Sequence, residues 1–308
     1  PKQQPILGRM VNPAPALAVP GLAFRAFEAA DGLRLAASTT PGHGPGLVLA
    51  HGFGQTRQAW AGTQQQLAAA GRASLAWDAR GHGESGRNAS HHAYHGEQFV
   101  DDVARAGLAL GGRPVLVGAS MGGLTGLMAQ AQHRLFSALV LVDITPRWEA
   151  SGVERILGFM TAHPDGFDSF EHAADEIAAY LPHRRSRKTP SQLAHLLVRR
   201  DDGRLAWHWD PRLLAEFIPS TDGLQHAIED ATRAIDVPVL LVSGGRSDLV
   251  SARTVEHFLE LAPHARHVQL PEATHMVAGD DNDAFTSALI EFLSDLAESH
   301  AATHGDSR

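Results

Sequence analysis

One segment constrains this chain more than any other: a run of buried-strand residues that leads directly into a serine flanked by glycines. Val115–Val117 is apolar, and Gly118–Gly122 forms G-x-S-x-G around Ser120, followed by a helix-compatible segment. The glycines let neighbouring backbone approach closely, while the serine sits on a strained strand-to-helix turn and projects its hydroxyl above the sheet. The same turn aims the backbone N–H of Met121 at the place where an oxyanion would form. The segment therefore predicts a nucleophile elbow.

Other short apolar runs also end in loops that carry polar residues. Leu47–Ala50 precedes His51–Gln55, Ala73–Trp77 precedes Asp78–Ser85, and Val237–Gly245 precedes Asp248. Each run has the length and composition of a buried strand. Because parallel strands place their carboxyl ends at one edge of a sheet, we expect these loops to converge there.

Together these segments resemble the α/β-hydrolase superfamily, in particular its carboxylesterase-like bacterial members with a helical cap. His51–Gln55 resembles the family's oxyanion loop, which implies that Phe53 donates a second backbone N–H beside that of Met121. Asp78–Ser85 resembles the family's D-x-R-G-H-G-x-S loop, which is usually scaffold. The resemblance covers nearly the whole chain and implies a doubly wound, mostly parallel α/β sheet with a cap insertion.

The resemblance also implies a Ser-Asp-His order for the catalytic triad, here Ser120, Asp248 and His275. His275 would take the serine proton and return it to a leaving group, while Asp248 would fix the imidazole tautomer. Asp143 competes for the acidic position, since it also ends a buried strand and some hydrolases of this fold carry their acid there. We expect Asp248, because its Gly-Gly-x-x-Asp setting resembles the common arrangement more closely, and we expect Asp143 to order the entry to the cap.

The alternation of strands and helices predicts the domain organisation. We expect an extended arm over residues 1–20, a core domain over 21–144 and 232–300 that opens with a hairpin, a helical cap over 145–231, and a flexible tail over 301–308. Arg199–Asp210 resembles a hairpin or turn found in caps of esterase-like members.

Eight of the 19 aromatic residues lie in the predicted cap. The majority would form its own small core and its seat on the main domain. Some must face the cleft, since a cap over Ser120 makes part of the pocket wall. We expect Trp148, Phe159 and Trp207 to contact substrate.

Charge and cysteine content narrow the classes of partner and chemistry. The formal net charge is −8 with no dense basic face, which argues against nucleic acid and anionic membranes as partners. The absence of cysteine removes disulfides, thiol catalysis and soft zinc ligands. The histidines of His91–His95 lack carboxylate company at ligand spacing, so we expect neither a metal nor a cofactor. With no apolar run long enough to span a membrane and no secretory pattern, we expect a cytoplasmic protein.

The sequence thus predicts a serine hydrolase acting on a small to medium carboxylic ester. A carbon–carbon bond hydrolase or lactonase with the same triad remains an alternative, as does a cofactor-free haloperoxidase or perhydrolase. A dioxygenase that uses His275 without serine attack and a small-molecule receptor retaining the triad also remain open. Serine rather than aspartate at position 120 argues against epoxide hydrolases and haloalkane dehalogenases. Oligomeric state is undetermined.

Overall fold

The centre of the molecule is a strand buried at every position, β5 (Val115–Ala119). A computed structural model describes residues 21–181, 187–217, 221–275 and 282–305, so the predicted arm over 1–20 lies outside the described residues. The strands are β1 (Ala23–Glu28), β2 (Arg34–Thr40), β3 (Leu47–Ala50), β4 (Ser74–Trp77), β5, β6 (Ala138–Val142), β9 (Val239–Gly244) and β10 (Arg266–Leu270). They form one sheet in the order β1-β2-β4-β3-β5-β6-β9-β10.

The sheet is parallel from β4 to β10, whereas β1 and β2 pair antiparallel at one edge. The predicted hairpin and the doubly wound, mostly parallel sheet are therefore confirmed. Parallel strands buried on both faces read as continuous apolar runs, which explains why β3, β5 and β6 were recognisable from sequence.

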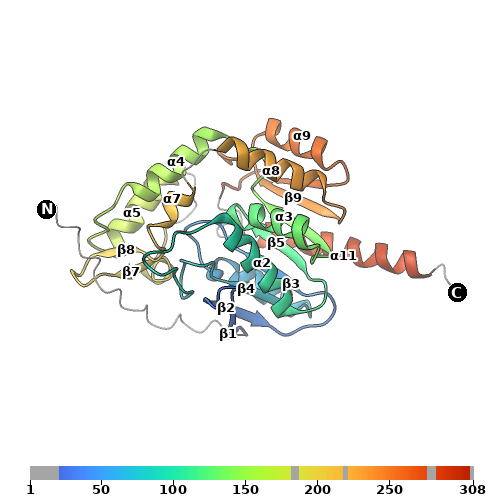
Figure 1. The fold of residues 1–308 in the computed structure, drawn as a ribbon, viewed down its shortest axis with the longest axis horizontal. Coiled ribbons are helices and arrows are strands. Elements are labelled where there is room, and N and C mark those ends of the chain that lie inside the picture. Colours follow the sequence, from blue (N-terminus) through green and yellow to red (C-terminus); the bar gives the residue numbers. More distant parts are fainter. Residues whose placement is uncertain (1–20, 182–186, 218–220, 276–281, 306–308) are drawn as a thin grey trace.

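Helices cover both faces of this sheet (Figure 1). They are η1 (Arg57–Trp60), α1 (Ala61–Ala69), α2 (Gly96–Leu110), α3 (Met121–His133), α9 (Ala252–Leu261) and α11 (Asn282–Gly305). Alternate residues along a strand point to opposite faces. Val48 accordingly joins a core cluster with residues of α2, α3 and α9, while Leu47 and Leu49 join one with α1 and α11.

A long insertion separates β6 from β9, and we call residues 145–233 the inserted segment. It contains α4 (Ala150–Thr161), α5 (Phe170–Tyr180), α6 (Pro190–Leu193), β7 (Leu197–Arg199), β8 (Leu205–Trp207), α7 (Leu213–Phe217) and α8 (Thr221–Arg233). Its α4, α5, β7 and β8 gather on one side of the molecule (Figure 1). A small core of its own, centred on Phe167, holds these elements together.

Two details refine the sequence expectation. The inserted segment contains a short antiparallel hairpin of β7 and β8, in the region where a hairpin or turn was expected. Helix α11 continues to Gly305, past the start of the predicted tail at residue 301.

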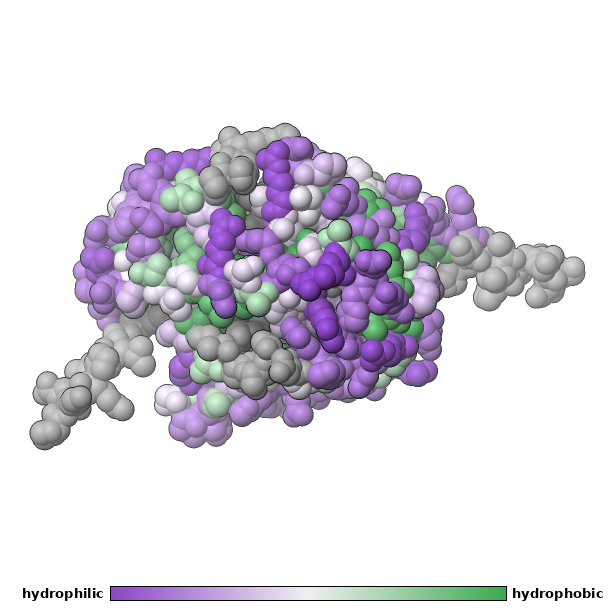
Figure 2. All heavy atoms as spheres, turned by 90° about the horizontal axis from the view of Figure 1, so that it is seen from above, coloured by the Kyte–Doolittle hydropathy of each residue, from purple (hydrophilic) through white to green (hydrophobic). Residues whose placement is uncertain are grey.

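On the face shown in Figure 2, hydrophilic residues predominate and hydrophobic ones are scattered among them.

Candidate active site

Ser120 stands on the turn between β5 and α3. Its backbone has φ 46° and ψ −115°, a conformation that L-residues rarely adopt, and its N–H donates to the Val142 carbonyl on β6 at 3.0 Å. Strain of this kind persists only where surrounding structure over-determines it, and it clusters at functional sites. The structure thus places Ser120 in the strained turn that the sequence predicted.

The glycines on either side of Ser120 are required by close backbone packing. A Cβ on Gly118 would lie 2.4 Å from the Gly122 carbonyl oxygen, and a Cβ on Gly122 would lie 2.5 Å from that of Ala50. Real Cβ atoms do not approach carbonyl oxygens so closely. Gly122 therefore lets α3 start directly against the end of β3.

The imidazole of His275 is joined to Asp143. Its Nδ1 lies 2.7 Å from Asp143 Oδ2, and since a carboxylate oxygen accepts, Nδ1 donates and Nε2 is left as the basic nitrogen. Asp143 directly follows β6, is fully buried and has φ 49°. Its carboxylate also accepts from the Gly244 N–H and the Ser247 hydroxyl. Three hydrogen bonds to one buried carboxylate thus hold the histidine and the exit of β9.

The expectation that Asp248 orients His275 is wrong. Asp248 Oδ2 instead pairs with Arg155 of α4 at 2.7 Å, at the margin of the inserted segment. The Asp143 carboxylate reaches the imidazole because β6 lies next to β5, so its exit opens beside that of the serine-bearing strand. The expected role of Asp143 as an organiser of the cap entry gives way to direct contact with His275.

The two predicted oxyanion donors come from different loops. Met121 is the first residue of α3, and the first N–H groups of a helix have no partner within that helix. Phe53 lies in His51–Gln55 after β3, where a Cβ on Gly52 would be 3.3 Å from Ser120 Cβ. The loop therefore runs alongside the serine.

A cavity of about 330 Å³ opens over Ser120. Ser120, His275 and Phe53 line it from the core, and the inserted segment supplies most of the remaining wall. Of the residues expected to contact substrate, Phe159 and Trp207 line this cavity. Trp148 does not, because it packs against the core of the main domain.

Sequence reasoning missed the cationic part of this wall. Arg155, Lys188 and Arg246 line the cavity, with Asp248 as the one carboxylate among the lining residues that the structure describes. Lys188 ends the short basic run over residues 183–188, of which 183–186 lie outside the described residues. Arg155 and Arg246 line the same cavity because α4 lies near the exit of β9, a proximity that only the fold supplies.

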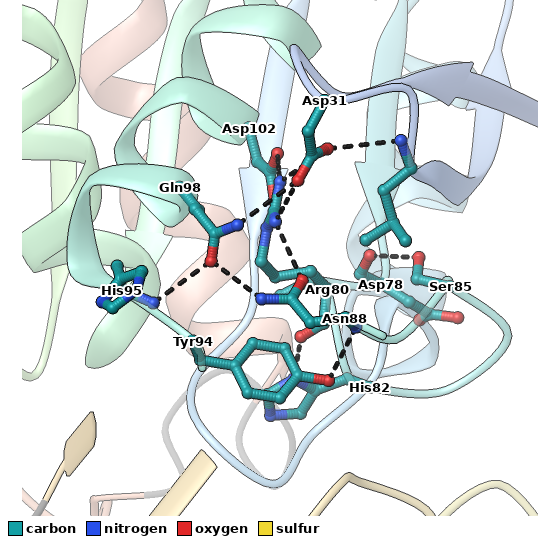
Figure 3. Close-up of polar contacts among 12 residues, drawn as sticks. Asp31, Asp78, Arg80, His82, Ser85, Asn88, Tyr94, His95, Gln98 and Asp102 are labelled. Atoms are coloured by element: carbon teal, nitrogen blue, oxygen red, sulfur yellow. Dashed lines mark hydrogen bonds and ion pairs between the residues drawn. The ribbon is translucent and has the colours of Figure 1, made fainter. Parts of the chain in front are cut away.

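The Asp78–Ser85 loop is held by a largely buried polar network (Figure 3). Arg80 is bidentate to Asp102, at 2.7 and 2.8 Å, and also contacts Asp31. Asp78 accepts from the backbone N–H groups of Arg57 and Glu84. This network fixes the Asp78–Ser85 loop next to the oxyanion loop, which its His82 contacts. Such an arrangement agrees with a scaffolding role.

Among the residues that the structure describes, no group of three or more His, Cys, Asp or Glu side chains is arranged to hold a metal ion. No helix in the described ranges combines the length and apolar character needed to cross a membrane.

The fold, with a serine on the turn after β5 and a histidine in the same cavity, is typical of one class of enzyme. A family model described as the alpha/beta hydrolase family matches residues 47–288, and the chain belongs to that family. Among curated proteins, it is 33% identical to the 3-hydroxybutyrate-oligomer hydrolase of Cupriavidus necator, over 74% of this chain and 82% of that protein.

Solved structures agree on the fold. An E-2-(acetamidomethylene)succinate hydrolase superposes with a TM-score of 0.75 at 24% identity, covering 89% of this chain and 99% of that one. An esterase from Mycobacterium tuberculosis superposes with a TM-score of 0.67 at 27% identity, covering 89% and 92%.

Proposed function

We propose that this protein is a serine hydrolase that cleaves a carboxylic ester through an acyl-enzyme. Ser120 Oγ attacks the ester carbonyl while His275 Nε2 takes its proton, and the backbone N–H groups of Phe53 and Met121 bind the resulting oxyanion. His275 then gives the proton to the departing alcohol. Water, deprotonated by the same nitrogen, releases the acid and restores the serine.

Asp143 takes the acidic position in this mechanism. Its carboxylate keeps the proton of His275 on Nδ1, which leaves Nε2 free to act as a base, and it stabilises the imidazolium that forms. The 2.7 Å contact between His275 Nδ1 and Asp143 Oδ2, in the same cavity as the strained Ser120, is the observation that carries the proposal.

The test is hydrolysis of p-nitrophenyl esters from acetate to decanoate, combined with fluorophosphonate labelling read by intact mass. We expect turnover and one label in the wild type, and loss of both in Ser120→Ala. Turnover that survives in Ser120→Ala would contradict serine attack. No turnover and no label in the wild type would favour the receptor or the dioxygenase.

The lining of the cavity favours a particular kind of ester. The inserted segment contributes an apolar wall that includes Ile156, Phe159 and Trp207. Three cationic side chains also line the cavity: Lys188, Arg155, which pairs with Asp248, and Arg246, which pairs with Glu272. Such a surface suits a short aliphatic ester with a free carboxylate at one end. Similarity to a 3-hydroxybutyrate-oligomer hydrolase points the same way. We therefore propose oligomers of short hydroxy acids as substrates.

This finer proposal has its own experiment. Hydrolysis of a 3-hydroxybutyrate trimer would be compared with that of its methyl ester, which has the same chain without the charge. We expect a higher kcat/KM for the free acid, and a smaller ratio in Arg246→Gln. Equal values for both substrates would rule out recognition of the carboxylate without touching the serine mechanism.

A further inference from the structure

Consecutive peptide groups of the oxyanion loop are each held by a different histidine. His51 Nδ1 lies 2.8 Å from the Gly52 carbonyl, in the peptide that carries the Phe53 N–H. His82 Nε2 accepts from the Gly54 N–H at 3.2 Å, in the next peptide. His208 Nε2 lies 3.2 Å from the Gly54 carbonyl, in the peptide after that.

The second ring nitrogen of each histidine also meets backbone, which fixes all tautomers. His51 Nε2 accepts from the Ala79 N–H, and His208 Nδ1 accepts from the Gly83 N–H at 2.8 Å. His82 Nδ1 lies 3.1 Å from the Arg80 carbonyl. Because a carbonyl only accepts and an N–H only donates, each ring carries one proton and is neutral. Burial also lowers the pKa of all these histidines, that of His208 to about 3.

These contacts determine where the Phe53 N–H points. The carbonyl and N–H of a trans peptide lie in one plane and point in opposite directions. The Gly52 carbonyl is held by His51 and by the Gln55 N–H at 3.1 Å. Because the Gly52 carbonyl is fixed, the direction of the Phe53 N–H is fixed as well. The hydrogen bonds of the Gly54 N–H to His82 and of the Gly54 carbonyl to His208 keep the two following peptide planes from rotating.

One of these histidines belongs to the inserted segment. His208 follows β8, and its own backbone is anchored to Leu196 by an N–H to carbonyl bond of 3.0 Å. Its neighbour Trp209 packs its ring 5.1 Å from that of Phe53. Met160 also packs against the loop, since a Cβ on Gly54 would lie 2.7 Å from the Met160 Cε. The inserted segment therefore contacts the oxyanion loop at Gly54 through His208 and Met160.

Resting on the proposed function, we infer that His208 is a positioning residue that couples the seating of the inserted segment to the oxyanion hole. Its Nε2–H holds the Gly54 carbonyl, and through it the loop that presents the Phe53 N–H. The ring bridges the inserted segment, the oxyanion loop and the Asp78–Ser85 loop.

Two near-isosteric substitutions separate the contacts of this ring. Gln at 208 extends far enough to donate to the Gly54 carbonyl but lacks the acceptor at the Nδ1 position. Asn at 208 retains a polar group near Gly83 but is too short to reach Gly54. The exposed His226 on α8, in the same segment, provides the control His226→Asn.

We expect His208→Asn to lower kcat about 10- to 100-fold with KM changed less than about threefold, since removing an oxyanion donor outright costs about 100- to 1,000-fold. His208→Gln should stay within about fivefold of the wild type. Affinity for an alkylboronic acid, whose tetrahedral serine adduct occupies the oxyanion position, should fall in parallel with kcat. His226→Asn should change neither.

Other results would overturn the inference. A folded His208→Asn with wild-type kcat and boronate affinity would show that the Gly54 contact does not position the loop. Should that variant fail to fold, loss of kcat in a folded His208→Gln would show that the Gly83 contact is the important one. Failure of the proposed function has a separate sign, namely absence of ester turnover and of fluorophosphonate labelling in the wild type.

Discussion

His275 and Asp143 lie 132 positions apart in the chain, yet their side chains are joined by a hydrogen bond of 2.7 Å. The carboxylate is fully buried, whereas the imidazole side chain keeps 15% of its surface exposed. One partner is therefore fixed inside the protein and the other faces the cavity. This contact supports the proposal that Asp143, rather than Asp248, is the acidic residue.

Asp143→Asn should lower kcat by about 1,000- to 10,000-fold, because an amide cannot favour the proton on Nδ1 as a carboxylate does. Asp248→Asn, which is equally conservative, should change kcat less than about tenfold, since Asp248 contacts Arg155 instead. Steady-state kinetics on one ester measure both, and circular dichroism confirms folding. The opposite ranking of the two variants would restore Asp248 as the acid.

Gly122→Ala should destabilise the protein by about 1–3 kcal/mol or more, because the new Cβ would lie 2.5 Å from the Ala50 carbonyl oxygen. Gly158→Ala, in the middle of α4, meets nothing within 4 Å and should stabilise by about 0.5–1 kcal/mol. Urea denaturation of both variants measures these changes. Equal free energies of unfolding would contradict the packing argument.

Asp102→Asn should cost about 3–5 kcal/mol of stability, because it leaves Arg80 buried with a weakened counter-ion. Both side chains of this pair are nearly inaccessible, at 1% and 2%. The exposed pair of Arg134 and Asp236 provides the comparison, and Asp236→Asn should change stability by less than about 1 kcal/mol. Guanidinium unfolding at pH 7 measures the difference, and a similar cost for both would be inconsistent with burial as its cause.

The stability of the wild type should fall in acid partly through His208. Burial lowers the pKa of His208 to about 3, from an ordinary value of 6.5. Between pH 6.5 and about 3, His208 is protonated in the unfolded chain but not in the folded protein. The free energy of unfolding therefore decreases as pH falls, by up to about 1.4 kcal/mol per pH unit. Above pH 6.5 this penalty is absent.

His208→Gln removes that titration. Its free energy of unfolding should therefore decline less steeply than that of the wild type between pH 6.5 and 4.5, while His51, His82 and Arg87 remain beside the site in both proteins. Denaturation series at several pH values provide the slopes. Parallel slopes would mean that His208 is not kept neutral by burial.

Much of the fold could be predicted because its signals are local. The apolar runs of β3, β5, β6 and β9 mark strands buried on both faces, and the serine turn depends on glycines adjacent in sequence. The contact of Trp148 with the main core could not be predicted in this way. It depends on how the inserted segment packs, which no periodicity encodes.

The choice between Asp143 and Asp248 as the acidic residue shows most clearly what local sequence signals cannot predict. Asp143 and Asp248 both follow a buried strand, so composition and spacing could not decide between them. The decisive facts are the pairing of β6 with β5, the φ of 49° at Asp143 and the N–H of Gly244 directed at its carboxylate. All of these are properties of the folded chain.

The pairing of Asp248 with Arg155 has a consequence for engineering. The three side chains proposed to cleave the bond follow β5, β6 and β10, whereas Arg155 of α4 and Asp248 after β9 lie in the wall of the cavity. Under the proposed function, these two wall residues are therefore separate from the residues that break the bond. A combinatorial library at Arg155 and Asp248 would explore new substrates while the machinery that breaks the bond stays intact.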